Sequence, residues 1–130
     1  MADPAEVTRV DPDSCSVRTV DADRVAAARA RMITGDEATQ VTELFRLLGD
    51  PTRVRMLYAL AEAGELCVCD LAAVVEVPET SVSHALRLLR TAGIVRSRRS
   101  GRMAYYSLDD AHVRLLLDVS AEHLRHDGRR

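Results

Sequence analysis

The chain has 130 residues, a length that predicts one domain, and its 47% apolar residues suffice for a modest core. With no Trp and one Phe, that core is expected to be aliphatic. No apolar run approaches the roughly 18 residues of a membrane-spanning helix, and the first residues lack the features of a signal peptide, so we expect a cytoplasmic protein. An odd number of cysteines, three, predicts reduced thiols and not a disulfide framework.

The formal net charge of -2 conceals an asymmetry along the chain. Residues 1–80 hold 15 acidic residues and 8 Arg, whereas residues 81–130 hold 5 acidic residues and 10 Arg. Such a division predicts that the second part of the chain binds a polyanion, even though the isoelectric point is near 6.1.

Residues 1–20 show no apolar period and are predicted to form a flexible arm. The remainder, residues 21–130, is expected to be one domain. Its first helix is predicted to begin at Asp21 and end near Gly35, and the next to be capped by Asp36. That second helix has an apolar stripe at helical spacing, made of Val41, Leu44, Phe45 and Leu48.

Asp50 and Pro51 give the strongest helix start in the chain, an N-cap followed by proline at the first helical position. A short helix over residues 67–75 follows, which needs its neighbours for stability, and Pro78 separates it from a helix that begins at Glu79. The inner stripe of the helix that begins at Glu79 is expected to hold Val82, Ala85, Leu86 and Leu89.

Two β-prone runs on either side of Ser100 and Gly101 predict a hairpin. A final helix is expected from Asp109 to about His126. The predicted fold is therefore mainly α with a small β-hairpin. A turn-linked helix pair followed by a basic hairpin is a winged helix-turn-helix.

The basic span, residues 81–106, contains six Arg and no acidic residue, a pattern that predicts binding to DNA phosphates. Small polar residues at the start of its helix can approach base edges, and Arg87 can reach guanine. The alternative, a solvated basic face, is disfavoured because the helix pair, the acid-free span and the basic hairpin occur together. The predicted DNA-binding residues are Ser81, Ser83, His84 and Arg87 on the helix, and Arg98, Arg99 and Arg102 on the hairpin.

The last helix carries four candidate ligands, Asp110, His112, His123 and His126. His112 and His123 are 11 residues apart, about 16 Å along a helix, so one helix cannot bring both to one metal. Two antiparallel copies can, which predicts two symmetric sites per dimer; ligands of this type favour Zn(II), with Co(II) or Ni(II) as alternatives. The alternative is that Asp110 caps the helix and the histidines are surface residues.

Cys67 and Cys69 form a second candidate site. In a regular helix, residues i and i+2 point about 200° apart, so both can bind one metal only if the first turn is irregular. A helix N-terminus is expected to lower the pKa of a thiol there. Cys15 on the arm is the natural third sulfur, with Asp70, Asp11 or Asp13 as a possible oxygen ligand, and three thiolates suit Cd(II), Pb(II) or As(III) better than zinc. The alternative is two small buried apolar residues and an unrelated Cys15.

Four stretches of the chain, residues 66–72, 81–90, 93–95 and 101–108, resemble the ArsR/SmtB family of metal-responsive winged-helix repressors. The similarity covers residues 37–126. It implies a homodimer with N-terminal and C-terminal dimerisation helices that binds a palindromic operator when metal-free and releases it when metal binds.

By the same resemblance, the four ligands of the last helix match the zinc site of the family, with His126 at a position where some relatives carry Glu. The cysteines resemble the thiolate site of the cadmium and lead sensors, in which the arm reaches the other protomer. Those sensors usually offer two arm cysteines, whereas this chain has only Cys15. Arsenite-sensing relatives share the run Leu-Cys-Val-Cys-Asp-Leu, so the run does not choose the metal.

We therefore expect a repressor that dissociates from its operator on binding Cd(II), Pb(II) or Zn(II) and derepresses metal-resistance genes. An arsenite or thiol-redox sensor acting through the cysteines is the alternative. An enzyme is not expected, because the chain has no His-Glu-x-x-His motif, nucleophile elbow or phosphate loop. A third possibility is a metal-buffering or architectural DNA protein without regulation.

Overall fold

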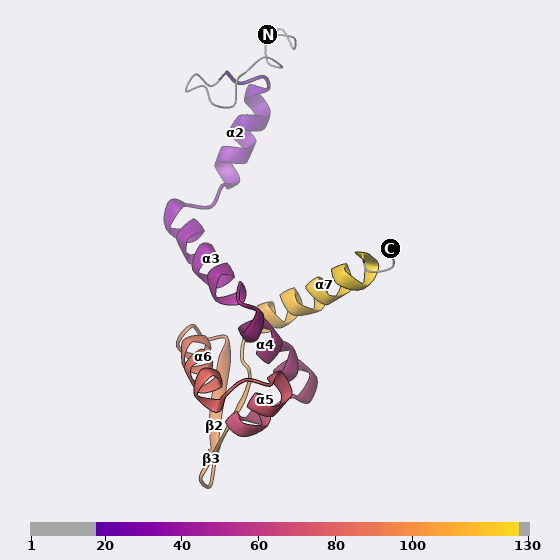
Figure 1. Cartoon of the computed structure of the whole chain (residues 1–130). Helices are drawn as coiled ribbons and strands as arrows, with labels where there is room; N and C mark the ends of the chain where they lie inside the picture. The colour runs from indigo at the N-terminus through magenta and orange to yellow at the C-terminus, as the bar shows by residue number, and fades with distance from the viewer. Residues whose placement is uncertain (1–17, 128–130) are drawn as a thin grey trace. The chain divides into compact units, whose positions relative to one another are not determined.

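The computed structural model describes residues 18–127, so Cys15, Asp11 and Asp13 lie outside the described residues (Figure 1). The chain divides into two compact units, Met1–Thr39 and Gln40–Arg130. The boundary between arm and domain expected after residue 20 stays a prediction.

The first unit holds helix α2 (Ala22–Arg31) and the start of α3 (Gly35–Leu48). Helix α2 begins where it was predicted, with Asp21 as its N-cap: the Asp21 carboxylate accepts a hydrogen bond from the Arg24 amide at 3.0 Å. The predicted end near Gly35 is wrong, because α2 ends at Arg31. The prediction that Asp36 caps α3 is wrong. Thr34 and Glu37 form a capping box instead: the Thr34 hydroxyl accepts from the Glu37 amide (3.1 Å), and the Glu37 carboxylate accepts from the Thr34 amide (2.8 Å).

The second unit begins within α3 and continues into α4 (Pro51–Ala63). The predicted cap is confirmed, because the Asp50 carboxylate accepts from the Arg53 amide at 2.9 Å. The Arg53 side chain also donates to the backbone oxygens of Leu47 (2.7 Å) and Arg46 (3.1 Å). These bonds satisfy carbonyl groups that the end of α3 leaves without an intrahelical partner, and so fix the turn from α3 to α4.

Helices α5 (Val68–Val75) and α6 (Glu79–Thr91) form the predicted turn-linked pair (Figure 1). Their inner faces meet α4 in an aliphatic core, as the composition predicted. The predicted inner stripe of α6 is confirmed, since its four residues are all buried. The largest fully buried side chains of the unit are Met56, Leu57, Leu60, Leu71, Val75, Val82, Leu86, Leu89, Ile94, Val95 and Val113.

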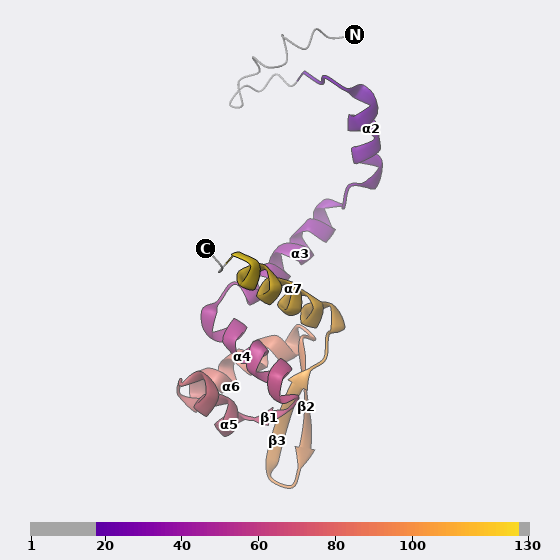
Figure 2. The same ribbon diagram turned by 90° about the vertical axis from the view of Figure 1, so that its right-hand side faces the viewer.

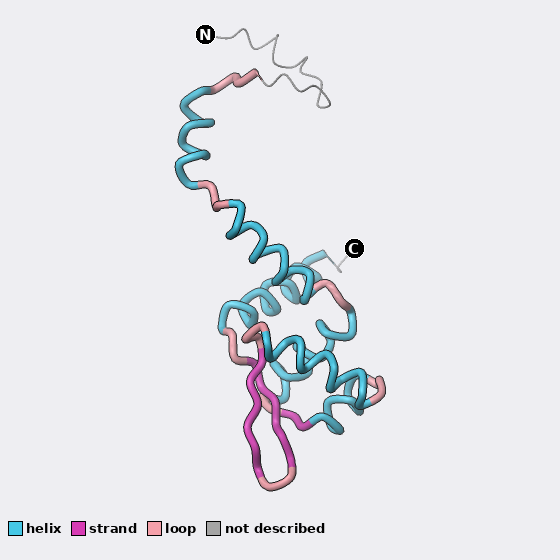
Figure 3. Tube along the Cα trace, turned by 90° about the vertical axis from the view of Figure 1, so that its left-hand side faces the viewer, coloured by secondary structure: helices cyan, strands magenta, loops and turns pink. Residues whose placement is uncertain are grey.

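The predicted hairpin consists of β2 (Val95–Ser100) and β3 (Met103–Leu108), drawn in magenta in Figure 3. Ser100 pairs with Met103, so the turn lies at Gly101 and Arg102, one residue beyond the position expected. The sequence did not indicate the two-residue strand β1 (Leu66–Cys67), which lies beside β3 (Figure 2) and gives an antiparallel sheet of order β1-β3-β2.

Helix α7 (Ala111–Asp127) inserts Val113 and Leu117 into the core. The Tyr58 hydroxyl donates to the Leu117 oxygen at 2.7 Å, which ties α7 to α4. Large apolar side chains stay exposed in the single chain on α7 and on α3, where the predicted stripe is only partly covered. They are Val41, Phe45, Leu115, Val119 and Leu124. No helix among the described residues is long and apolar enough to cross a membrane.

Two adjacent leucines of α6, the predicted DNA-binding helix, test how the core stabilises it. Leu89 is fully buried, whereas Leu88 is 38% exposed. We expect Leu89→Ala to lower the free energy of unfolding by about 2–5 kcal/mol, because it leaves a cavity. Leu88→Ala should lower it by far less. Urea unfolding at one protein concentration measures both, and equal losses would contradict this assignment of the core.

Candidate thiol metal centre and DNA interface

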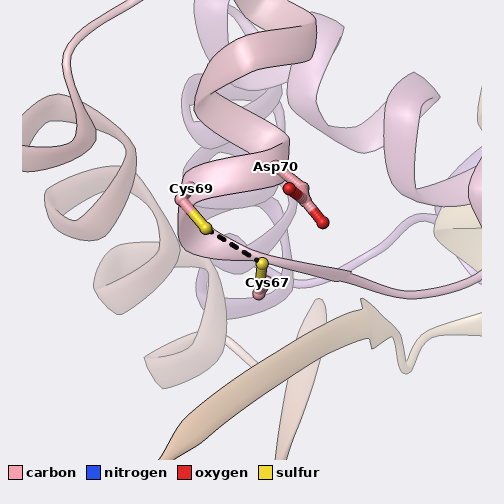
Figure 4. A group of neighbouring side chains, drawn as sticks. All are labelled: Cys67, Cys69 and Asp70. Atoms are coloured by element: carbon pink, nitrogen blue, oxygen red, sulfur yellow. Dashed lines mark hydrogen bonds between the residues drawn. The ribbon is translucent and has the colours of Figure 1, made fainter.

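Cys67 and Cys69 come together because Cys67 is not part of helix α5. Cys67 ends strand β1 and is the N-cap of α5, with an extended backbone (φ -79°, ψ 169°), whereas Cys69 lies in the first turn of the helix. Their sulfur atoms face one another 3.3 Å apart (Figure 4). The irregular start that a shared site requires is therefore present. Cys67 is buried and Cys69 is exposed, so the pair opens to solvent on one side.

Asp70 completes a cluster of three potential ligands. One ligand atom from each of Cys67, Cys69 and Asp70 lies within 4.8 Å of the others, and the Asp70 side chain stands beside the two sulfurs in Figure 4. Two sulfurs bound to one tetrahedral zinc at about 2.3 Å are about 3.8 Å apart, so the observed spacing needs only a small opening. The donor set fits a metal that accepts sulfur and oxygen.

The thiol of Cys69 has a pKa above its usual value. The hydrogen bond with Cys67 is the largest cause, followed by desolvation and by the negative charges of Cys67 and Asp70. The prediction that the helix N-terminus lowers the thiol pKa is therefore wrong for Cys69, because the hydrogen bond with Cys67, desolvation and the neighbouring charges outweigh the lowering effect of the Asp70 backbone. A metal ion at this cluster has to displace protons, and its affinity depends on pH.

The four predicted ligands of the last helix fall into two pairs at opposite ends of α7. Asp110 caps the helix through one oxygen, Oδ1, which accepts from the amides of His112 (2.8 Å) and Val113 (3.2 Å). The Nδ1 atom of His112 lies 3.4 Å from that same oxygen, and His123 and His126 are exposed one turn apart near the other end. Among the described residues of one chain, only the thiol cluster gathers three ligands.

The predicted reading residues lie on the exposed side of α6. Ser81, Ser83, His84 and Arg87 are exposed, opposite the buried stripe of the helix. A surface hollow of about 610 Å³ brings Ser83, His84 and Arg87 beside Val68, which stands between the two cysteines in the chain. The start of the thiol-bearing helix thus borders the reading face. A second hollow, of about 510 Å³, is lined by Ser83, Arg87, Arg90, Thr91 and Tyr106.

The three predicted arginines of the hairpin are not equivalent. Arg99 and Arg102 are exposed and, among the residues that the structure describes, form no ion pair. Arg98 instead binds both carboxylate oxygens of Glu65, and its guanidinium lies over the Tyr105 ring at 4.9 Å from the centroid. The Arg98 hydrogen bonds lower the pKa of the Glu65 carboxyl, so this pair is charged at neutral pH. Sequence reasoning missed both Glu65 and Tyr105, which have no motif of their own.

Comparison with known proteins identifies this arrangement. Residues 50–97 match the family described as bacterial regulatory protein, arsR family. The SmtB homologue of Synechocystis, a transcriptional repressor, is 45% identical over 111 residues, which cover 85% of this chain and 83% of that protein. The chain belongs to the ArsR/SmtB family. A CadC homologue from Staphylococcus aureus, a cadmium resistance regulatory protein, is 40% identical over 113 residues, 87% of this chain and 93% of the relative.

The crystal structure of AntR, an antimony-specific transcriptional repressor, superposes with a TM-score of 0.71 at 34% identity, covering 90% of this chain and all of that one. The family is one of metal-sensing transcriptional repressors, and the helix pair and hairpin of this chain form its winged helix-turn-helix. The prediction of a regulator and not an enzyme is confirmed by these relatives.

The raised pKa of Cys69 predicts slow alkylation. In a metal-free Cys15→Ser background, the iodoacetamide rate of Cys69 should reach its half-maximum at a higher pH than that of a free thiol, because only the thiolate reacts. Cys67→Ala removes the largest cause and should move this midpoint to lower pH. Mass spectrometry of the alkylated peptide measures it. An unchanged midpoint in Cys67→Ala would contradict the assigned cause.

The exposed Arg99 is expected to contact a DNA phosphate. Arg99→Ala should therefore weaken binding to specific and random DNA alike, and reduce the slope of log K against log salt by about 0.9 for each phosphate that is no longer neutralised. Arg125, which pairs with Glu122 at 2.7 Å near the end of α7, offers the matched control. Arg125→Ala should leave the slope unchanged. Equal slopes for Arg99→Ala and the unmodified chain would show that Arg99 contacts no DNA phosphate.

Proposed function

We propose that this protein is a homodimeric, cytoplasmic repressor that binds a palindromic operator when metal-free and dissociates when Cd(II), Pb(II) or Zn(II) binds, so that metal-resistance genes are derepressed. Residues 21–130 form the sensing and DNA-binding domain in this proposal, and residues 1–20 form an arm. The relatives named SmtB and CadC homologues support metal regulation of this kind.

The observation that carries the proposal is the position of the thiol cluster. Cys67, Cys69 and Asp70 lie at the start of α5, the first helix of the helix-turn-helix, and Val68 borders the same hollow as the reading residues of α6. A soft metal ion at this cluster would be held by thiolates and a carboxylate, with Cys15 as the proposed third sulfur. A shift at the start of α5 would change how α6 presents its reading face.

Dimerisation is supported by the apolar side chains that α3 and α7 leave exposed in the single chain. Two copies related by a two-fold axis would present two α6 helices to successive major grooves of a palindrome. On DNA, we assign base contacts to Ser81, Ser83, His84 and Arg87, and phosphate contacts to Arg99 and Arg102.

The same two-fold symmetry would complete the second metal site. Asp110 and His112 of one protomer would meet His123 and His126 of a second copy in antiparallel α7 helices, giving a zinc site of nitrogen and oxygen ligands. The separation of these pairs at opposite ends of α7 supports a shared site over one within a single chain.

Arsenite or thiol-redox sensing is the second candidate. It is favoured by the likeness to AntR, an antimony-specific repressor, and by the 3.3 Å approach of the Cys67 and Cys69 sulfurs. A trivalent metalloid would take these two thiolates and Cys15 and leave the histidines of α7 unused.

Operator affinity of the reduced protein at fixed salt, with and without each metal, tests the proposal. We expect Zn(II), Cd(II) and Pb(II) each to weaken binding by about 5- to 150-fold, the usual range of such coupling. Cys67→Ser should abolish the cadmium and lead responses, because it removes a thiolate ligand. His123→Ala should abolish only the zinc response. Fluorescence anisotropy of labelled operator gives the affinities.

Thiolate-to-metal ultraviolet absorption, recorded in the same titration, reports metal loading independently of DNA release. Cys15→Ser tests the third sulfur, since its loss should weaken this absorption. No change in operator affinity with any metal would refute metal sensing. A Cys67-dependent arsenite response, with every metal response intact in His123→Ala, would favour the second candidate.

A further inference from the structure

A cross-strand row of side chains joins the thiol cluster to the hairpin. Strand pairing places Cys67 of β1 opposite Tyr105 of β3, and Tyr105 opposite Arg98 of β2. Residues directly opposite one another in an antiparallel sheet share a face and contact each other. Arg98, Tyr105 and Cys67 therefore form one continuous row across all three strands of the sheet.

Glu65 links the two ends of this row, because it bonds Arg98 and lies in the same segment as Cys67. It precedes β1 by one residue and lies two residues before Cys67, so it shares the face on which Cys67 projects. Its carboxylate accepts from Arg98 through two short bonds, Nε to Oε2 at 2.7 Å and Nη2 to Oε1 at 2.6 Å. This fork geometry fixes direction as well as distance, unlike a single-point ion pair. The guanidinium also packs over the Tyr105 ring.

The pairing with Glu65 changes the role that the sequence predicted for Arg98, which was DNA binding. Two of its donors are occupied by Glu65, and the carboxylate neutralises its charge, so Arg98 is a poor phosphate ligand beside the exposed Arg99 and Arg102. Its bonds instead hold the hairpin against the segment that leads into the thiol cluster. Cys67 belongs to β1, and β1 is joined to the hairpin both by its ladder to β3 and by the Glu65 bridge to β2.

We propose that Glu65, Arg98 and Tyr105 form a strut through which the state of the thiol cluster sets the position of the hairpin on DNA. The proposal rests on the proposed function, because it assigns the route by which metal-driven release reaches the hairpin. Glu65 and Arg98 are positioning residues here and neither a metal ligand nor a base-reading group.

The electroneutral double variant Glu65→Gln/Arg98→Gln tests the strut without changing net charge. We expect its metal-free operator affinity and salt slope to match those of the unmodified protein, because Arg98 contacts no phosphate. Its cadmium charge-transfer absorption should also persist, since all cysteines remain. The cadmium-induced fall in operator affinity should shrink by about fivefold or more, a loss at the lower end of allosteric coupling.

The single variants and a control sharpen the result. Glu65→Gln and Arg98→Gln should each lose as much coupling as the double variant, because either change breaks the same bridge. Tyr105→Phe keeps the ring and should retain the coupling. Glu62→Gln, at an exposed carboxylate near the end of α4, should behave as the unmodified protein. Circular dichroism confirms folding, which we expect to survive because Glu65 and Arg98 are both solvent-accessible.

Three outcomes would overturn the strut: full cadmium coupling in the double variant, a salt slope reduced by about 0.9 per protomer, or a metal-free affinity that falls as far as cadmium lowers it in the unmodified protein. In each case the unmodified protein still responds to cadmium, and the proposed function stands. If the unmodified protein itself shows no response to any metal, the proposed function fails instead.

Discussion

The change from strand to helix at Cys67 is the constraint on which the thiol cluster depends. Cys67 has an extended backbone because it pairs with Tyr105 in the sheet, and it caps α5 because the helix begins at the next residue. In a continuous helix the two cysteines would point to different faces. The junction instead brings their sulfurs to 3.3 Å, beside Asp70, and joins this cluster to the sheet.

The same junction connects the thiol cluster to the predicted DNA-binding helix and hairpin. Helix α5 packs through Leu71, Ala72 and Val75 into the core that holds the inner stripe of α6, so the two helices form one packed body. Because protein interiors are close-packed, a displacement of α5 would be transmitted to α6. On the other side, β1 is bonded to β3, and the Glu65 bridge reaches β2. The cluster is therefore connected to both predicted DNA-binding elements, to α6 through the packing of α5 and to the hairpin through the sheet and the Glu65 bridge.

Local sequence signals predicted most of the fold. The Asp50-Pro51 helix start and the apolar stripe of α6 depend on only a few neighbouring residues, and the structure has both as expected. The Asp36 cap was wrong because a capping box at Thr34 and Glu37 competed with it, a signal that the sequence also contains. Strand β1 and the Glu65–Arg98 bridge could not be predicted, since their partners lie about 30 to 40 positions away and neither has a motif.

The spacing of the residues predicted which side chains could be ligands, whereas it did not predict the pKa of the Cys69 thiol. Alternation and helix geometry showed that Cys67 and Cys69 need an irregular turn, but the raised pKa of Cys69 depends on how closely the sulfurs approach. The two ligand pairs on α7 remain separated in one chain, so the proposed zinc site requires a second copy. The burial of Cys67 and exposure of Cys69 are likewise products of packing.

Reciprocity offers the most direct measurement of the central claim, that the thiol cluster and the operator are coupled. Cadmium affinity, followed by thiolate-to-metal absorption, is measured for the free protein and for the protein bound to its operator. Linkage requires the operator to weaken cadmium binding by the same factor by which cadmium weakens operator binding. We predict equal factors, in the range of about 5- to 150-fold. Equal cadmium affinity with and without operator would contradict the coupling.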